Sequence, residues 1–205
     1  MSGRLASVNV GRPREVPRGL LSTWTAIWKE PVDGRVRVHG VNLDGDDQAD
    51  RNAHGGPDKA VYAYAREDTA WWETELGREL GPGAFGENLT LEGVDVTGAV
   101  IGERWAIGTT VLEVCQPRFP CFKLDLRFDD RGMVRRFSIA RRPGAYLRIV
   151  TEGELAAGDG VEIVATPDHG VTIGLVNEAI LHDRALLAQA LAAPELARTL
   201  RELAA

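Results

Sequence analysis

Residues 110–124 read TVLEVCQPRFPCFKL, and the interpretation of the whole chain starts from this stretch. Its first part, Thr110–Cys115, is an apolar, β-branched run of ordinary strand length. Pro117 and Pro120 follow it so closely that regular structure cannot continue. The sequence therefore predicts a strand that leaves a sheet and presents Cys121 in a rigid loop.

A helix over Phe122–Phe128 is expected to follow, which places the Cys121 thiol at a helix N-terminus. That position, between the positive charges of Arg118 and Lys123, favours the thiolate. A thiolate is both a nucleophile and a ligand for soft metals. The alternative is a buried structural cysteine, because free cysteine is among the most buried residue types. Cys115, inside the apolar run, is interpreted as such a core residue.

Short β-branched runs broken by glycine, proline and aspartate extend from Leu5 to about Val164. The expected strands are Leu5–Val10, Thr23–Ile27, Arg35–Val38, Lys59–Tyr64, Val111–Val114, Ala145–Val150 and Val161–Val164. Two helices are expected between them. Arg66–Glu79 begins with acidic residues that suit a helix N-terminus, and Asp129–Arg142 must end before Pro143. The predicted fold class is mainly β with α.

After Pro167 the leucines recur at helical spacing. The expected helices are Val171–Ile180, Asp183–Leu191 and Pro194–Leu203. Asp183 fits a helix N-cap and Pro194 fits a first helical position. We therefore expect a β-rich domain over residues 1–165, followed by a small three-helix region over residues 166–205.

Composition excludes several classes of protein. With 205 residues, 44% of them apolar and 26% charged, the chain is not a disordered tail. The net charge of −6 argues against a nucleic-acid or anionic-membrane partner. Two cysteines are too few for a disulfide scaffold, and neither a membrane span nor a secretory signal is visible. We expect a cytoplasmic monomer or homodimer with reduced thiols.

Positive charge is concentrated in one segment. Residues 131–148 hold six arginines and no acidic residue, whereas the remainder holds 18 basic and 30 acidic residues. The six are Arg131, Arg135, Arg136, Arg141, Arg142 and Arg148. Arginine suits bidentate phosphate binding, so this segment fits one anionic ligand better than a nucleic-acid backbone. The alternative is a solvated helix face.

Three further motifs are unusual. Adjacent glycines in His54–Ala60 let backbone amides approach an anion or a ring, although Gly-Gly-Pro also forms plain turns. Phe85–Leu89, FGENL, places a Glu-Asn pair at the start of an expected strand, where a bulge or turn is the alternative. Residues 42–50 carry aspartates at alternate positions but lack the glycine and glutamate of a calcium loop. A solvated acidic turn is favoured there.

Taken in order, the segments Gly45–Asp50, His54–Val61, Phe85–Leu89 and Gln116–Leu124 resemble the MOSC domain. The similarity is to its YiiM-like branch of bacterial molybdenum proteins. The region after Pro167 is similar to the three-helix extension of that branch, so the resemblance covers nearly the whole chain. It implies a MOSC-type β-barrel that binds the molybdenum cofactor, a pterin with a dithiolene and a phosphate.

The resemblance also implies roles for particular residues. It makes Cys121 the protein ligand of molybdenum, and a soft thiolate suits a metal already held by sulfur. Glu87 and Asn88 are expected to complete the catalytic set by hydrogen bonding to the cofactor or relaying a proton. The residues expected to bind the cofactor are His54, Gly55, Gly56, Lys59, Phe85, Gly86, Arg118, Lys123, Arg135, Arg136, Arg141 and Arg142. The last four are assigned to the phosphate.

The activity implied is reduction of N-hydroxylated compounds, such as hydroxylaminopurines and amidoximes, to amines or amidines. No flavin or haem motif is visible, so a separate flavin-containing reductase is the expected electron donor. The alternative is a non-catalytic carrier or sulfur-transfer module that handles the cofactor. A phosphate-binding module without metal, using the arginines alone, is a further alternative. Pyridoxal phosphate on Lys59 or Lys123 is not expected, because neither lysine lies in an evidently buried setting.

Overall fold

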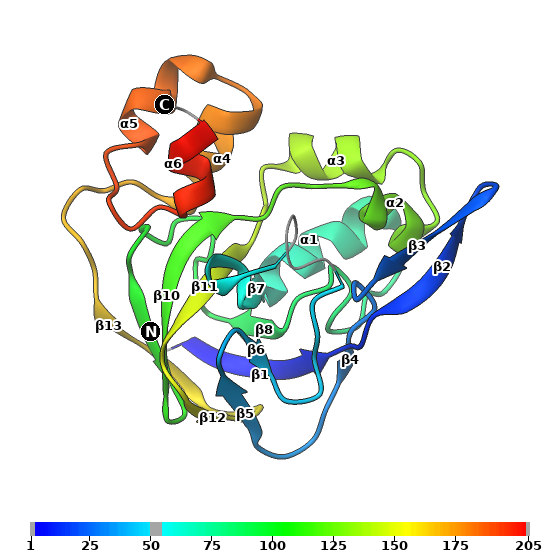
Figure 1. The fold of residues 1–205 in the computed structure, drawn as a ribbon, viewed down its shortest axis with the longest axis horizontal. Coiled ribbons are helices and arrows are strands. Elements are labelled where there is room, and N and C mark those ends of the chain that lie inside the picture. Colours follow the sequence, from blue (N-terminus) through cyan, green and yellow to red (C-terminus); the bar gives the residue numbers. More distant parts are fainter. Residues whose placement is uncertain (1–2, 50–54, 204–205) are drawn as a thin grey trace.

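The computed structural model describes residues 3–49 and 55–203, and within these residues seven strands close into a barrel (Figure 1). The barrel strands are β1 (Gly3–Val10), β7 (Val61–Ala65), β8 (Leu89–Glu92), β9 (Arg104–Ile107), β10 (Thr110–Pro117), β11 (Ala145–Thr151) and β13 (Gly160–Ala165). Their order around the barrel is β13, β9, β10, β11, β7, β8 and β1, and pairing of β1 with β13 closes the ring. The predicted β-barrel class with additional helices is confirmed.

The parallel pairing of β7 with β8 requires a crossover connection. Helix α1 (Arg66–Leu76) is part of this connection and lies against the outside of the barrel (Figure 1). Glu67 and Asp68 lie in its first turn, as the sequence predicts. The helix ends earlier than expected, because Gly77 adopts the left-handed conformation at φ 63° and terminates it.

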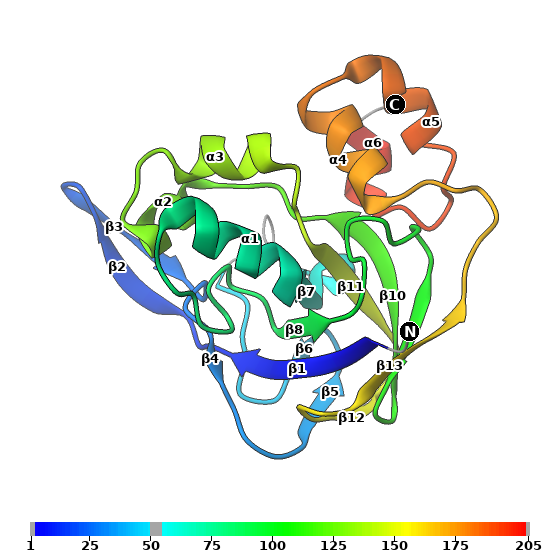
Figure 2. The same cartoon turned by 180° about the vertical axis from the view of Figure 1, so that it is seen from behind.

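Smaller sheets surround the barrel. They are formed by β5 (Val36–His39), β6 (Asn42–Leu43) and β12 (Gly153–Leu155), by β4 (Glu30–Pro31) on the end of β1, and by the hairpin of β2 (Arg14–Arg18) with β3 (Leu21–Thr25). Figure 2 shows this hairpin projecting from the body of the molecule beside α2. The strand expected at Thr23–Ile27 is therefore β3, which starts and ends two residues earlier. The strand expected from Lys59 begins at Val61, because Pro57–Lys59 forms a 3-10 turn, η1.

Two helices follow β10 along the chain. α2 (Phe122–Phe128) has the bounds that the sequence predicts, and α3 (Met133–Ala140) is shorter than the predicted Asp129–Arg142. Asp129 and Arg141 both adopt left-handed backbone angles, with φ 50° and 54°, and each ends the helix before it. These two breaks fold the segment back over the barrel.

The aromatic side chains form a second hydrophobic cluster outside the barrel, between its wall and helices α1 to α3. The ring centroids of Tyr64 and Phe85 lie 4.6 Å apart, and those of Trp72 and Phe137 lie 6.1 Å apart with nearly parallel planes. Such contacts add roughly 1 kcal/mol each beyond the area they bury. They fix the segment around Phe85 against the barrel.

The C-terminal region packs on β10 (Figure 1). Its elements are α4 (Ile173–Leu181), η2 (Arg184–Leu186), α5 (Leu187–Ala190) and α6 (Arg198–Leu203). Asp183 accepts a hydrogen bond from the Ala185 amide at the start of η2, as expected of a cap. Pro194 does not begin the last helix, which starts at Arg198 after a turn. Leu196 and Leu200 join the same hydrophobic core as the barrel strands. The division of the chain at residues 165 and 166 stays a prediction.

One residue connects several of these parts. The Asp58 carboxylate accepts hydrogen bonds from Arg148 Nε at 3.0 Å and from the Arg198 amide at 3.1 Å. The Asp58 carbonyl accepts from Cys115 Sγ at 2.9 Å and from Gln116 Nε2 at 3.2 Å. Asp58 therefore joins the segment before β7 to β10, to β11 and to the last helix.

Replacement of this carboxylate tests its structural role. Asp58→Ala leaves the half-buried Arg148 with fewer acceptors and the Arg198 amide without one, which is expected to lower the free energy of unfolding by about 2 kcal/mol. Denaturant unfolding monitored by circular dichroism measures the change. Asp33→Ala, at an exposed turn, is the control and is expected to stay within about 0.5 kcal/mol of the parent. Equal effects of the two substitutions would contradict the role of Asp58.

Candidate functional site

A cavity lies where β10 ends and α2 begins. Residues from five segments line it, namely 25–29, 46–49, 59–62, 85–88 and 118–123, together with Tyr146 of β11. These segments are distant in sequence and meet because the barrel brings the ends of β7, β10 and β11 together. Seven of the predicted site residues come together in this cavity, namely Lys59, Phe85, Gly86, Asn88, Arg118, Cys121 and Lys123.

The two cysteines occupy different environments. Cys121 precedes α2 as its N-cap residue, with extended backbone angles, and it lines the cavity. Cys115 is fully buried, and its thiol donates to the Asp58 carbonyl. Burial raises the pKa of the Cys115 thiol far above its ordinary value. Of the two sulfur atoms, only that of Cys121 is placed to bind a group in the cavity.

Arg118 is a cation buried in the wall of this cavity. Its side chain is only 6% exposed, and its guanidinium lies over the rings of Tyr62 and Phe137, at 5.3 Å and 5.4 Å from their centroids. Its Nη1 atom has no hydrogen-bond partner. Burial raises the pKa of Tyr62 and of Tyr146, so these phenols stay neutral at pH 7 and do not compensate the charge. A buried guanidinium nitrogen without an acceptor is costly, which points to an anionic ligand.

Three lysines line the same cavity, namely Lys29, Lys59 and Lys123. Burial lowers the pKa of Lys29, although the neighbouring carboxylate of Asp46 opposes this by pairing with it. Asp46 also accepts from the Gly11 amide at 2.8 Å and from Asn88 Nδ2 at 2.9 Å. Among the described lining residues, four basic side chains face two acidic ones, so the cavity suits an anion.

The segment of Phe85, Gly86 and Asn88 forms one side of the cavity. A side chain on Gly86 would place its Cβ 2.8 Å from Ile27 Cγ1, and the φ of Gly86 is 78°, so only glycine fits this approach. Both polar atoms of the Asn88 side chain are hydrogen-bonded. Its Nδ2 donates to Asp46, and its Oδ1 accepts from the Tyr62 backbone amide at 3.0 Å. Phe85, Gly86 and Asn88 all line the cavity.

Glu87 differs from the expectation. It is absent from the described residues that line the cavity, and its side chain is completely buried. Its carboxylate accepts from the amides of Gly83 and Phe85, at 2.7 Å and 3.0 Å, and from Thr90 Oγ1 at 3.0 Å. Burial raises the pKa of Glu87, and these donors oppose that shift. The structure therefore places Glu87 inside its own loop, where it shapes the segment that carries Phe85 and Asn88.

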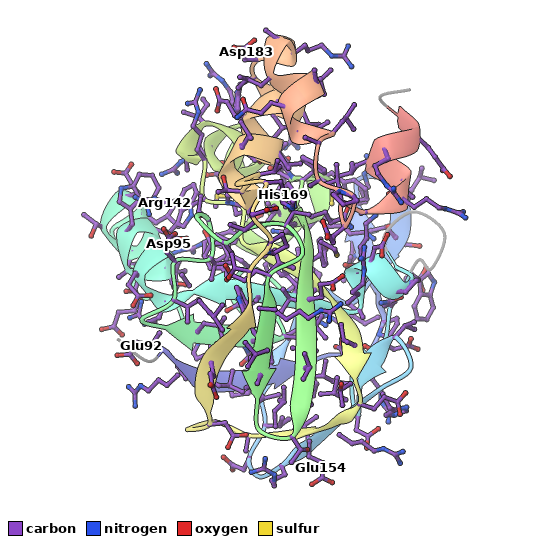
Figure 3. All side chains as sticks on the ribbon, turned by 90° about the vertical axis from the view of Figure 1, so that its left-hand side faces the viewer. Glu92, Asp95, Arg142, Glu154, His169 and Asp183 are labelled. Carbon is purple, nitrogen blue, oxygen red and sulfur yellow. The ribbon has the colours of Figure 1, made fainter. Side chains whose placement is uncertain are left out.

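The four arginines assigned to the cofactor phosphate are also placed elsewhere, since none is among the described residues lining the cavity. Arg141 forms a bidentate pair with Glu178 of α4, at 2.6 Å and 3.1 Å, and Arg142 pairs with Asp68 of α1. Figure 3 shows Arg142 on the outside of the molecule, beside α1. Arg136 pairs with Asp130 at 3.3 Å, and Arg135 is exposed on α3. Acidic residues of α4 and α1 thus pair with arginines of residues 131–148, a segment that contains no acidic residue.

The glycine motif is only partly described. His54 lies outside the described residues, and neither Gly55 nor Gly56 is among the residues that line the cavity. Gly56 has φ 93°, and its amide donates to Gln48 Oε1 at 2.9 Å. The space that a Cβ of Gly56 would enter is open. The motif is thereby fixed to Gln48, which itself lines the cavity.

Sequence reasoning missed several lining residues, among them Lys29, Asp46, Tyr62 and Tyr146. The resemblance contained a signal for Asp46, since it lies in the quoted GDDQAD motif. Nothing local marks Lys29, because its place in the cavity depends on a tertiary contact with Asp46. No group of three or more His, Cys, Asp or Glu side chains able to hold a metal occurs in the described part of the chain. In the same part, no helix is long and apolar enough to cross a membrane.

Comparison with known proteins adds to this geometry. The model of the MOSC domain matches residues 50–162. The protein YflK of Bacillus subtilis is 36% identical over 177 residues, which span 86% of this chain and 80% of YflK. YiiM of Escherichia coli is 32% identical over 162 residues, which span 77% of this chain and 70% of YiiM.

Two solved structures are similar over nearly their full length. YiiM from Geobacillus stearothermophilus has a TM-score of 0.81 and 29% identity, with 98% of this chain and 97% of that one covered. YiiM from Escherichia coli has a TM-score of 0.78 at 24% identity, covering 100% and 90%, and supports the fold. A Gibberella moniliformis protein named Reductase is 32% identical over 169 residues, which span 80% of this chain and 30% of that protein.

The contrast between the cysteines predicts selective alkylation. Iodoacetamide at pH 8 is expected to modify Cys121 in the folded protein and to leave Cys115 unmodified, because the Cys115 thiol is inaccessible and its raised pKa keeps it protonated. Peptide mass spectrometry locates the label. Cys121→Ser is expected to remove labelling until the protein is unfolded in guanidinium chloride. Comparable labelling of Cys115 in the folded protein would contradict the assignment.

Proposed function

This chain belongs to the MOSC domain family, and on that premise we propose that it holds the molybdenum cofactor in the cavity beside Cys121 and reduces N-hydroxylated compounds. Membership associates the chain with the molybdenum cofactor in general. The proposal adds the site, the protein ligand and the reaction.

The unpaired Nη1 atom of Arg118 carries the proposal. A buried cation beside an accessible thiol fits a cofactor that combines a soft metal with anionic sulfur and phosphate groups. Lys59 and Lys123 add positive charge on the same walls. The residues present therefore fit the cofactor, with the Cys121 thiolate as metal ligand and Arg118 as hydrogen-bond donor to an anionic part of it.

The reaction has a simple balance. An N-hydroxy group takes up two electrons and two protons. The N–O bond breaks, and the products are an N–H group and water. When bound, the cofactor supplies this two-electron chemistry at its metal. The chain binds, orients and shields the reactants. Phe85, Phe119 and Tyr146 give the cavity an aromatic lining on which a planar purine stacks.

The protons require a titratable group in the cavity. Glu87 faces its own loop, whereas the Lys29 and Asp46 pair lines the cavity. Burial lowers the pKa of Lys29, which makes its Nζ a better proton donor than an exposed lysine. We assign proton delivery to Lys29 Nζ, with Asp46 holding it in place. Asn88 positions Asp46 through its amide.

The electrons come from a partner in this proposal. A relative named Reductase, of which this chain spans only 30%, supports reductive chemistry for this kind of domain. We propose a flavin-containing reductase as the donor and an N-hydroxylated small molecule as the substrate. Both cysteines are free thiols, which suits the reducing cytoplasm.

Substitution of the proposed ligand is the direct test. Cys121→Ser is expected to lose bound molybdenum and to lower N-hydroxylaminopurine reduction at least 100-fold, because a serine hydroxyl is a poor ligand for a soft metal. Elemental analysis and an assay with reduced methyl viologen as donor measure the two losses. Protein produced with an ample supply of the cofactor is required.

The matched control is Cys115→Ser, which keeps a hydrogen-bond donor toward Asp58 and is expected to retain both molybdenum and activity. If Cys121→Ser retained both, the ligand assignment would be wrong. A wild-type protein that binds molybdenum but reduces nothing with methyl viologen would instead favour the carrier alternative.

Arg118 offers a second test that is independent of turnover. In the absence of cofactor, Arg118→Met is expected to raise the free energy of unfolding by about 1–2 kcal/mol, because an uncompensated buried charge is replaced by an apolar chain of similar length. The same substitution is expected to lower molybdenum content at least tenfold. Thermal unfolding of the cofactor-free proteins and elemental analysis check the two effects. A loss of stability with unchanged molybdenum would assign Arg118 to the fold alone.

A further inference from the structure

The hairpin of β2 and β3 holds large apolar side chains in solvent. Leu20 at its tip is fully exposed, Leu21 is 78% exposed and Trp24 is 58% exposed. Figures 1 and 2 both show the hairpin reaching beyond the barrel and the helices. Burial of such side chains against a partner would remove apolar surface from water, which is favourable. A group of this kind on one projecting element marks an interaction surface.

Two arginines, one at each end of β2, hold the hairpin against the body of the molecule. Its two strands pair in continuous register from Arg14 with Thr25 to Arg18 with Leu21. The Arg14 guanidinium lies 4.2 Å from the ring centroid of Trp28, and the Arg18 guanidinium lies 3.8 Å from that of Phe122. The apolar tip is therefore presented in a defined direction.

The same element borders the proposed redox site. β3 ends at Thr25, and Thr25, Ala26 and Ile27 line the cavity. Phe122, which Arg18 covers, directly follows Cys121. A protein seated on the hairpin would thus lie beside the cavity, as electron transfer between two proteins requires.

Charge identifies the kind of partner. Residues 12–25 and 122–136, the hairpin and the α2–α3 segment, carry eight basic and four acidic residues, whereas the rest of the chain carries 16 and 26. Burial lowers the pKa of Arg127 in α2, with Glu30 and Glu87 opposing this shift and Arg14 and Arg78 adding to it. The excess of basic over acidic residues in these two segments favours an acidic partner surface.

We propose that the β2–β3 hairpin and the basic side of α2 form the docking surface for an acidic flavodoxin-like FMN protein that reduces the site. The inference rests on the proposed function, because it names the donor for that cavity. Oxidation of FMNH2 to FMN releases the two electrons and two protons that convert an N-hydroxy group to N–H and water. Two leucines and one tryptophan, with Glu15 and Ser22 bonded beside them, form a surface that suits a protein better than a lipid bilayer.

Direct binding is the first test. Titration of the full chain with purified flavodoxin by calorimetry is expected to show saturable binding that weakens as salt increases. Leu20→Ser/Leu21→Ser is expected to raise the Kd at least tenfold. The matched control is Ile163→Ser/Val164→Ser on β13, where two apolar side chains are 54% and 50% exposed away from the hairpin, and it is expected to leave the Kd unchanged. No binding by the wild-type chain, or equal losses in both double variants, overturns the proposal.

Turnover with two donors separates this inference from the proposed function. Leu20→Ser/Leu21→Ser is expected to keep the full rate with reduced methyl viologen and to lose at least tenfold in kcat/KM for reduced flavodoxin. If the wild-type chain fails with methyl viologen, the proposed function fails, and the titration alone decides the docking surface. If both variants equal the wild type with flavodoxin, only the docking inference fails. Cosedimentation with anionic phospholipid vesicles, lost in the leucine variant and without flavodoxin binding, would assign the hairpin to membranes instead.

Discussion

The hydrogen bonds of Asp58 to β10, β11 and α6 are the contacts on which the arrangement of the site depends. The carbonyl of Asp58 is held by Cys115 and Gln116, two residues near the end of β10, and its carboxylate is held by Arg148. The chain then turns through Pro117 and Pro120 to present Cys121. Because Lys59 follows Asp58 directly, the same contacts set the distance between two walls of the cavity. The C-terminal helices take part, since the Arg198 amide completes the set.

The cavity combines this rigidity with an electrostatic cost. Arg118 is buried with an unpaired nitrogen, Lys29 is buried against one carboxylate, and both phenols nearby are held neutral by burial. A protein selected only for stability would place apolar side chains there. The aromatic cluster packed against α1 to α3 offsets part of this cost by fixing Tyr62 and Phe137 beside the guanidinium. The unpaired charge of the cavity is thus the complement of the anionic ligand proposed for it.

Features that depend on a few neighbouring residues could be predicted from the sequence. Features that depend on contacts between distant segments could not. The start of β10 and the bounds of α2 were predicted, because β-branching and proline act over a few residues. The expected end of the strand at Cys115 was wrong, since β10 continues to Pro117, which pairs with Ala145. The closure of β1 on β13 and the turn at Pro194 depend on tertiary packing, which no local pattern contains. Cys115 lies in the core, as its place inside an apolar run indicated, and Cys121 follows the proline segment and lines the cavity, while its role as a metal ligand stays a prediction.

The arginines of residues 131–148 show most clearly that contacts between distant segments cannot be predicted from a local pattern. Residues 131–148 contain six arginines and no acidic residue, and this indicated a phosphate site. In the folded chain, Glu178 and Asp68 come from α4 and α1 to pair with Arg141 and Arg142, and Asp58 and Glu113 meet Arg148. The segment therefore joins the helices to the barrel. The cations that line the cavity come from three separate segments, with Lys29 in one, Lys59 in another, and Arg118 and Lys123 in the third. A ligand site assembled in this way leaves no cluster in the sequence, so its charge is visible only after folding.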